Sequence, residues 1–243
     1  MNKKTAIVTG ASSGIGFAIA KTFLKQGYNV IGNARTMDSL EKAKKSLDGV
    51  ENFLLVPGDI GLPSTAKNIF ETALRAFGSV DVLINNAGIF NAKPFIDYQE
   101  SELDALISTN LKGFVFTSQE AARHMIPRKS GHIINITASI ANQPLMQVPA
   151  SLPILIKGGL NHATKALALE LAPFNIQVSA VAPGIIDTPL YTQDLHDFLK
   201  TLQPTGRIGS PKDIADAVLF LANSKFATGV ILPIDGGMTA GRW

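Results

Sequence analysis

Short runs of apolar residues alternate along the chain with longer stretches in which apolar positions recur every three or four residues. The short runs have the length and the β-branched content of strands, whereas the longer stretches have the spacing of amphipathic helices. Because the short runs are almost continuously apolar, the strands they predict are covered on both faces. Seven strands are predicted, over residues 5–9, 29–33, 53–56, 82–84, 132–136, 177–181 and 230–234.

The stretches between these strands predict helices over residues 15–26, 40–47, 65–77, 101–126, 154–171 and 211–222. Right-handed crossovers between successive strands then give an α/β fold, a doubly wound parallel sheet with helices on both faces. No repeat or linker interrupts the alternation, so residues 1–243 are interpreted as a single domain. Two long connections, 137–153 and 189–207, are expected to frame a substrate, because such folds keep their sites at the carboxyl ends of the strands.

The composition excludes several classes of function. The 243 residues include no cysteine, so disulfides, thiolate nucleophiles and cysteine-ligated zinc are ruled out, and no metal site is predicted. The net charge is only +3 and forms no basic tract, which argues against a nucleic-acid partner. There is no apolar run of about 18 residues for a membrane span and no signal-peptide pattern. A cytoplasmic protein that acts on a small-molecule substrate is therefore expected.

A glycine-rich turn links the first predicted strand to the first predicted helix. Residues 9–16 read TGASSGIG, with glycines at 10, 14 and 16. Glycine permits positive φ and close backbone approach, and the free N–H groups at the start of a helix attract an anion. In this strand-to-helix context, the turn is predicted to hold the pyrophosphate of a dinucleotide.

Further motifs follow in an order and spacing that are typical of one family. The glycine turn has the pattern TGxxxGxG, and NNAG stands at 85–88, where the fourth strand ends. Other matches are DI at 59–60, NLKG at 110–113, PGIIDT at 183–188, GRIG at 206–209 and DGG at 235–237. Over essentially its whole length the chain resembles the short-chain dehydrogenase/reductase family, in particular its 3-oxoacyl-carrier-protein reductases. The resemblance implies a single-domain Rossmann fold and an oxidoreductase that uses a nicotinamide cofactor.

The resemblance also implies which residues bind the cofactor. Asp59 would contact the adenine, the region around Asn86 would form the floor of the cofactor site, and Thr188 would hold the carboxamide. The amides of Asn85 and Asn86 can also tie strand ends to neighbouring backbone, and the two roles are compatible. The predicted cofactor-binding residues are Gly10, Ser12, Ser13, Gly14, Ile15, Gly16, Arg35, Asp59, Ile60, Asn86, Ala87, Gly88, Lys157, Pro183, Gly184, Ile186 and Thr188.

The end of the second strand favours NADP(H), with NAD(H) the less favoured cofactor. An acid at this point would accept hydrogen bonds from the ribose hydroxyls and repel a 2′-phosphate. The sequence has Arg35 there instead, and its guanidinium can form a charge-assisted fork on phosphate. The alternative interpretation of Arg35 is a solvated arginine at the start of a loop. Ser12 and Ser13 in the glycine turn add no second cation that would strengthen the preference for NADP(H).

The resemblance implies a catalytic set of asparagine, serine, tyrosine and lysine. Asn110 would support a water relay, and Lys157 would lower the tyrosine pKa and hold the nicotinamide ribose. The tyrosine lies four residues before the lysine, on the same helix face, but here that position is Pro153. Proline has no proton to exchange, so the central acid/base is absent. The serine position falls on Ala138 or Ser139, of which Ser139 is favoured.

Pro153 is compatible with the first turn of a helix, where its missing N–H is not needed, and Ser151 is a plausible cap. A replacement acid would have to come from elsewhere in the chain. Tyr191, in the long connection 189–207, is the first candidate. The candidates after it are His132, His162 and His196.

The sequence leaves three functions open. The first is an NADP(H)-dependent oxidoreductase for a carbonyl or hydroxyl compound, with an altered proton donor. The second is a catalytically silent NADP(H)-binding protein that serves as a sensor or partner subunit, and the third is non-redox chemistry such as hydration or elimination. The resemblance further implies a homo-oligomer, a tetramer or dimer, that pairs through the helices predicted at 101–126 and 154–171.

Overall fold

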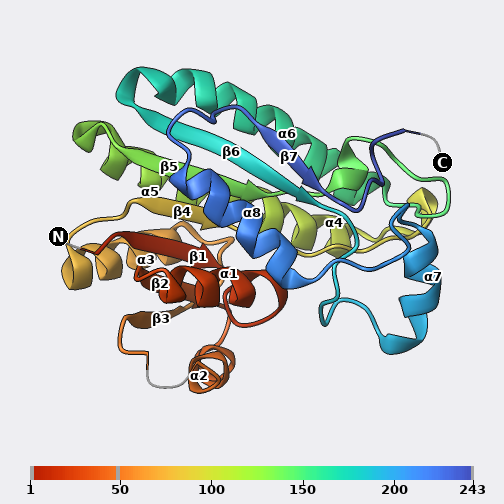
Figure 1. Ribbon diagram of the computed structural model, residues 1–243, viewed down its shortest axis with the longest axis horizontal. Coiled ribbons are helices and arrows are strands. Elements are labelled where there is room, and N and C mark those ends of the chain that lie inside the picture. The colour runs from red at the N-terminus through yellow and green to blue at the C-terminus, as the bar shows by residue number, and fades with distance from the viewer. Residues whose placement is uncertain (1–2, 48–49, 242–243) are drawn as a thin grey trace.

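The structure, a computed structural model, describes residues 3–47 and 50–241. Seven parallel strands form one sheet in the order β3-β2-β1-β4-β5-β6-β7 (Figure 1). The strands are β1 (Thr5–Thr9), β2 (Asn29–Ala34), β3 (Phe53–Pro57), β4 (Val82–Asn85), β5 (Gly131–Ile136), β6 (Ile176–Pro183) and β7 (Ile231–Ile234). The predicted fold class is confirmed, and the predicted strands differ from these only by a residue or two at their ends.

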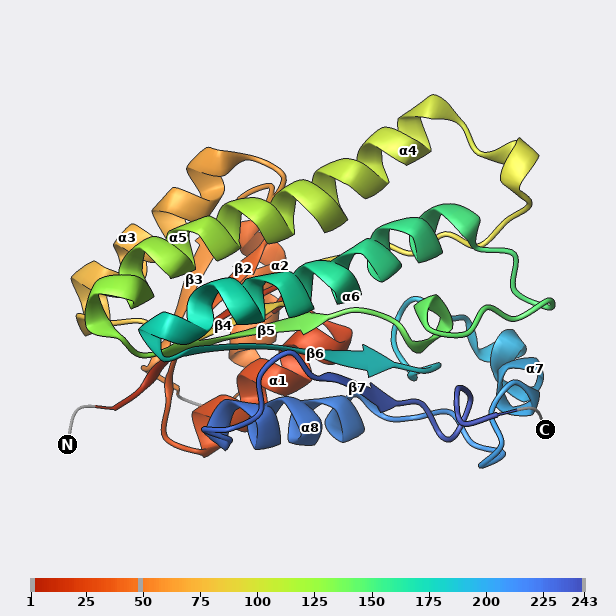
Figure 2. The same cartoon turned by 90° about the horizontal axis from the view of Figure 1, so that it is seen from above.

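Helices cover both faces of this sheet. The α-helices are α1 (Gly14–Lys25), α2 (Met37–Lys45), α3 (Pro63–Phe77), α4 (Glu100–Leu106), α5 (Gly113–Arg128), α6 (Ser151–Leu171), α7 (His196–Thr201) and α8 (Pro211–Asn223). Figure 2 shows α1 and α8 on one side of the sheet and α3, α5 and α6 on the other. None of these helices, within the described ranges, is long and apolar enough to cross a membrane.

The two layers of helices create two apolar cores, one on each face. Successive residues of β1 point in opposite directions, so Val8 packs with Phe23 of α1 while Ile7 packs with Ile69 of α3. Every residue of β1 is buried. This double burial explains why the strand sequences are continuously apolar rather than alternating.

The helix predicted over 101–126 is interrupted in the structure. Between α4 and α5 the chain forms a π-helix (Ile107–Lys112), in which the helical turns are wider. Asn110 lies in this π-helix and is buried. The prediction of one regular helix was therefore wrong at the point where a candidate catalytic side chain is located.

Other helix boundaries also differ from the prediction. α2 begins at Met37 rather than 40, because the Thr36 hydroxyl caps it by accepting from the Ser39 N–H at 3.4 Å. α6 begins at Ser151 with Ala150 as its N-cap, so the expectation that Ser151 caps this helix was wrong. The short helix α7 lies inside the connection 189–207 and was not predicted.

The strand order defines where a ligand can bind. β1 lies between β2 and β4, so the chain leaves the carboxyl ends of β1 and β4 in opposite directions across the sheet. A crevice forms at such a reversal point in doubly wound folds. The glycine turn follows β1 and the NNAG segment follows β4, so both motifs lie at this point.

Candidate functional site

The glycine turn folds tightly onto the carboxyl edge of the sheet. The Ala11 N–H donates to the Asn33 carbonyl at 2.9 Å, which joins the turn to the end of β2. A Cβ added to Gly16 would lie 2.1 Å from the Gly10 carbonyl oxygen, so no larger residue is accommodated there. Ser13 is the N-cap of α1, but no side chain caps the helix and its first turn holds no acid. The uncompensated helix N-terminus fits an anionic pyrophosphate.

The NNAG segment is bonded directly to the glycine turn. The Thr9 hydroxyl accepts from the N–H groups of Asn86 and Ala87 at 3.0 and 2.9 Å. The Asn86 amide donates to the carbonyls of Thr9 and Gly10 at 2.9 and 3.3 Å. Asn85 instead donates to Ser118 and Asn135, both at 3.0 Å. Both amides therefore tie strand ends together, and the site they fix is rigid.

The ends of β2 and β3 carry the predicted contacts for the adenosine half of a cofactor. Arg35 is exposed directly after β2, and none of the ion pairs among the described residues involves it. Asp59 is exposed after β3, where one of its carboxylate oxygens accepts from the Gly61 N–H at 2.9 Å. Ile60 beside it is buried. An unpaired guanidinium at this edge fits a phosphate group.

The segment that follows β6 returns over the glycine turn. A Cβ added to Gly14 would lie 3.3 Å from a methyl carbon of Thr188, so this threonine lies next to the start of α1. The segment is held by the Gly184 N–H, which donates to Ile234 at 3.0 Å, and by the Asp187 N–H, which donates to Gly209 at 2.8 Å. The predicted residues after β1 and after β6 thus lie side by side.

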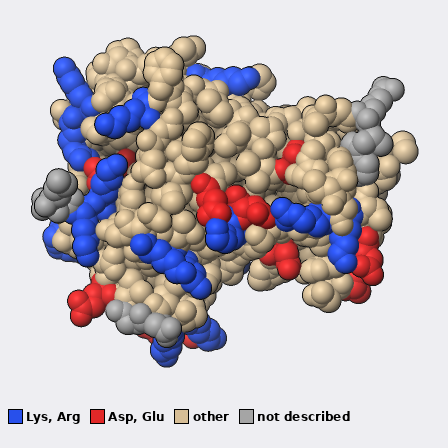
Figure 3. Space-filling model, in the orientation of Figure 1, with Lys and Arg blue, Asp and Glu red and all other residues tan. Residues whose placement is uncertain are grey.

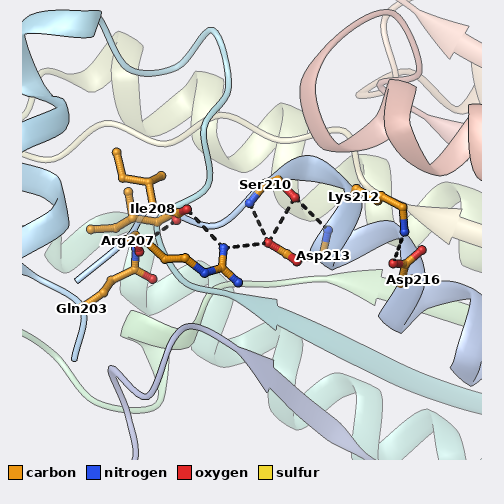
Figure 4. Close-up of polar contacts among 8 residues, drawn as sticks. Gln203, Arg207, Ile208, Ser210, Lys212, Asp213 and Asp216 are labelled. Carbon is orange, nitrogen blue, oxygen red and sulfur yellow. Dashed lines mark hydrogen bonds and ion pairs between the residues drawn. The ribbon is translucent and has the colours of Figure 1, made fainter. Parts of the chain in front are cut away.

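A polar network behind this segment keeps it in place (Figure 4). The Asp213 carboxylate accepts from Arg207 at 3.1 Å and from the Ser210 N–H at 2.8 Å. The buried Gln203 amide donates to the Ile185 carbonyl at 3.2 Å. Gln203, Arg207 and Asp213 also line a cavity of about 240 Å³, in which the Arg207 guanidinium is paired with the Asp213 carboxylate. Figure 3 likewise shows red and blue side chains adjoining over α8 near the middle of that face. The network supports the segment after β6 from behind.

Asn110 and Lys157 meet beneath the NNAG segment. A Cβ added to Gly88 would lie 3.2 Å from the Asn110 Oδ1 and 3.3 Å from the Lys157 Nζ. The Asn110 amide donates to the Ile89 carbonyl at 2.9 Å and accepts from the Ile89 N–H at 2.8 Å. The Lys157 ammonium donates to the Ile136 carbonyl at 2.9 Å. The structure therefore brings two of the three predicted catalytic residues together.

A cavity of about 10 Å³ lies between Asn110 and Lys157, with space for about one water molecule. Its other walls are the polar residues Thr9, Asn85 and Asn135 together with apolar groups, and Lys157 is the only ionisable residue among the described residues that line it. Burial lowers the pKa of Lys157 to about 8, because desolvation disfavours the charged amine. This lysine therefore changes charge near neutral pH.

Pro153 occupies the face of α6 that Lys157 also occupies, one turn earlier. Both residues are buried. Pro153 is the third residue of the helix, and the first helical bond is donated by Ile154 to Ala150 at 2.9 Å. The helix therefore loses no hydrogen bond to the proline. The position from which a tyrosine would act is filled by a side chain that has no polar group.

The predicted serine lies in a buried turn after β5. Ser139 starts a 3₁₀ turn (Ser139–Ala141), is completely buried, and its hydroxyl has no hydrogen-bond partner among the described residues. Ala138 is the part-exposed residue at this point. Of the two alternatives for the serine position, Ala138 is therefore the more exposed, but it carries no hydroxyl.

The candidate replacement acids occupy different environments. His132 lies at the amino end of β5, opposite the site, and burial lowers its pKa to about 4. His162 is exposed on α6, and His196 lies 3.6 Å from Asp187 at the start of α7. Tyr191 packs with Ile185, Leu199 and Leu202 near the site, and burial raises the pKa of its phenol. His132 is therefore excluded by position, while Tyr191 is disfavoured as an acid by its raised pKa.

The fold and this arrangement of residues define a doubly wound protein of the Rossmann class. The family model described as enoyl-(acyl carrier protein) reductase matches residues 10–239. The chain belongs to the short-chain dehydrogenase/reductase family of oxidoreductases. It is 36% identical over 248 residues to the 3-oxoacyl-[acyl-carrier-protein] reductase FabG of Thermotoga maritima, with 97% of each chain covered. It is 35% identical over 246 residues to (2S)-[(R)-hydroxy(phenyl)methyl]succinyl-CoA dehydrogenase subunit BbsD of Thauera aromatica, with 98% of this chain and 97% of the relative covered.

Solved structures agree with this assignment. ElxO with NADP bound superposes with a TM-score of 0.93 at 29% identity, covering 98% of this chain and 100% of that chain. The 3-ketoacyl-(acyl-carrier-protein) reductase from Brucella melitensis, complexed with NADH, gives a TM-score of 0.92 at 32% identity, covering 97% and 98%. Both nicotinamide dinucleotides therefore occur among similar structures, and the choice between them depends on particular residues.

Proposed function

We propose that this protein binds NADP(H) at the carboxyl edge of the sheet and reduces or oxidises a small carbonyl or hydroxyl compound without a tyrosine acid. The observation that carries the proposal is that the glycine turn contacts both the NNAG segment and Thr188 at this edge, with Asn110 and Lys157 against Gly88. When bound, the cofactor supplies or accepts the hydride. The roles of this chain's residues are to bind the cofactor, to orient it and to supply a proton.

The binding roles proposed here are those that the resemblance implies, and the contacts around the crevice support them. The turn from Gly10 to Gly16 and the N-terminus of α1 would hold the pyrophosphate. Asp59 and Ile60 would hold the adenine. The segment from Asn86 to Gly88 would form the floor of the site. Lys157 would bind the ribose, and Pro183 to Thr188 would hold the carboxamide end. The close approach of Thr188 to Gly14 supports a site that encloses the cofactor from two sides.

Arg35 is expected to make NADPH bind more tightly than NADH. Its unpaired guanidinium can bind a 2′-phosphate, so Arg35→Asp should remove or reverse the preference by loss of this contact and by new like-charge repulsion. The expected change is about 2 kcal/mol, or roughly 30-fold in relative affinity. Calorimetric titration with both cofactors measures it. Arg75→Asp, at a basic position on α3, is the control. Equal affinities for NADPH and NADH in the unmodified protein would contradict the prediction.

A second candidate function is a catalytically silent NADP(H)-binding protein. It is favoured by one specific observation: the residue one turn before Lys157 on the buried face of α6 is Pro153, which has no proton to donate. Such a protein would bind the cofactor and report its level, or serve as a partner subunit.

One experiment separates the two functions. Calorimetry first establishes NADPH binding, and the protein is then screened with a panel of aliphatic and aromatic ketones while NADPH consumption is followed. Turnover above the rate of heat-denatured protein supports the oxidoreductase. Tight NADPH binding with no turnover of any ketone supports the silent protein instead.

We also propose that the protein is a homo-oligomer that pairs through α5 and α6. α6 exposes apolar side chains on its outer face, where Leu155 and Leu169 are 68% and 80% exposed. A two-fold axis would make such a face cover itself. Light scattering at micromolar concentration should give the mass of a dimer or tetramer, and Leu169→Lys should lower it. A monomer mass for the unmodified protein would contradict this.

A further inference from the structure

Proton supply is the one step of the proposed reaction for which the family residue is missing. The tyrosine position is Pro153, and the 3₁₀ turn that follows β5 buries Ser139. His132 lies at the wrong end of its strand, and the pKa of Tyr191 is raised by burial. Neither His162, exposed on α6, nor His196, at the start of α7, lines the small cavity beside Asn110. The reaction needs a group at the crevice that can donate a proton and whose pKa lies near neutral pH.

Lys157 is the ionisable group that the structure places at this point. Its Nζ lines the small cavity with Asn110 and lies against Gly88, directly beneath the NNAG segment. The charged side chains on the elements packed against α6 do not line that cavity: Glu100, Glu102 and Asp104 on α4 and Lys112 in the π-helix. Among the residues that the structure describes, no carboxylate therefore lines the cavity to compensate the buried ammonium.

The hydrogen bonds of Lys157 leave it free to exchange a proton. An ammonium has three N–H donors, and the described bond to the Ile136 carbonyl uses one. Burial by apolar and amide groups lowers its pKa to about 8, within the range in which a general acid is effective near neutral pH. A water molecule in the cavity bordered by Asn110 would connect it to the rest of the site.

We propose that Lys157 itself is the proton donor in carbonyl reduction, in the place of the missing tyrosine. In this step an N–H bond of the ammonium breaks and the O–H bond of the product alcohol forms, leaving a neutral amine. A proton taken from bulk solvent and passed on through the cavity water then restores the ammonium. The hydride that reduces the carbonyl carbon comes from the reduced nicotinamide dinucleotide of the proposed function, on which this inference rests.

The first test is a measurement that does not depend on activity. In protein labelled with ¹³C at the lysine ε-carbon, the Lys157 signal is assigned by its loss in Lys157→Met, and its chemical shift is followed from pH 6 to 11. A titration near pH 8 is expected. A titration above pH 10, like that of an exposed lysine, would overturn the proposal.

The second test is the pH profile of ketone reduction at saturating NADPH. Because only the ammonium can donate, kcat should be constant below the pKa and fall about tenfold per pH unit above pH 8. Lys157→Arg keeps a cation but is a much weaker acid, so it should lower kcat at pH 7 by about 10²-fold or more and remove the fall above pH 8. Lys165→Met, at an exposed lysine on the same helix, should reproduce the unmodified profile.

The outcomes distinguish this inference from the proposed function. If ketones are reduced but Lys157→Arg keeps the original rate and profile, the proton comes from another group and the inference alone is wrong. If NADPH binds and no ketone is reduced, the proposed function fails and the inference fails with it. Calorimetry on Lys157→Arg shows whether a lost rate reflects lost cofactor binding. NADPH affinity within about threefold of the unmodified protein would assign the loss to proton transfer.

Discussion

Pro153→Tyr is expected to raise the rate of NADPH-dependent ketone reduction by about 10²-fold to 10⁴-fold, the usual contribution of a positioned acid. Position 153 lies one turn before Lys157 on the same buried face of α6. A phenol there would have the Lys157 ammonium nearby, and an adjacent positive charge lowers the pKa of a tyrosine. A phenol is also a larger group that reaches further from the helix than proline. The new hydroxyl would therefore act where Lys157 alone acts in the unmodified protein.

Pro153→Phe is the matched control for this variant, because it adds the same ring without the hydroxyl. It should leave the rate unchanged or lower it. The helix itself tolerates both changes, since the N–H restored at its third residue needs no partner within the helix. A tyrosine variant that gains no more than the phenylalanine variant, while both bind NADPH, would show that a proton donor is not what limits the rate. Ala138→Ser added to Pro153→Tyr then tests whether the part-exposed turn after β5 needs a hydroxyl as well.

The strands and most helices follow from the sequence because a parallel sheet buried on both faces has a strong local signal. β1 was predicted with its observed bounds, and its residues are all buried, as continuous apolarity requires. Two helix starts had signals that were missed. Thr36 is a capping residue just before α2, and Pro63 stands at the first position of α3, where proline is favoured.

The π-helix could not be predicted in the same way. It adds part of a residue to each turn, which hardly changes the apolar spacing on which the helix prediction depends. Its stability comes from tertiary contacts, since the Asn110 amide bonds both backbone groups of Ile89, far away along the chain. The sequence motif identified the residue, but only the structure shows how it is turned inward.

Sequence spacing could not decide between Ala138 and Ser139 for the serine position, because the two residues are adjacent. Ala138 and Ser139 are neighbours just after β5, where a 3₁₀ turn begins, and Ala138 is part-exposed whereas Ser139 is completely buried. A shift of one residue therefore decides whether the serine position is part-exposed or buried. In contrast, Pro153 could be recognised from the sequence alone, because helix geometry fixes the four-residue interval to Lys157.

The glycine turn gives the second large effect. Gly16→Ala should weaken NADPH binding by about 100-fold, equivalent to about 3 kcal/mol, because the added Cβ cannot be accommodated without moving the turn. That Cβ would lie 2.1 Å from the Gly10 carbonyl oxygen and 2.4 Å from the Asn86 amide nitrogen. Both atoms are fixed, since the Asn86 amide bonds Thr9 and Gly10. The displaced N–H groups would no longer converge on the pyrophosphate.

Gly159→Ala makes the same chemical change inside α6 and provides the control. A Cβ there meets nothing within 4 Å, so the substitution should leave NADPH affinity unchanged and stabilise the helix by about 0.4–1 kcal/mol through the loss of unfolded-state freedom. Calorimetry and thermal unfolding are measured on both variants. If Gly16→Ala binds NADPH as tightly as Gly159→Ala does, the cofactor does not depend on the close packing of the turn against Asn86. The pyrophosphate would then have to bind elsewhere along the carboxyl edge of the sheet. In that case Arg35→Asp, at the exposed residue that follows β2, should no longer change the preference for NADPH over NADH.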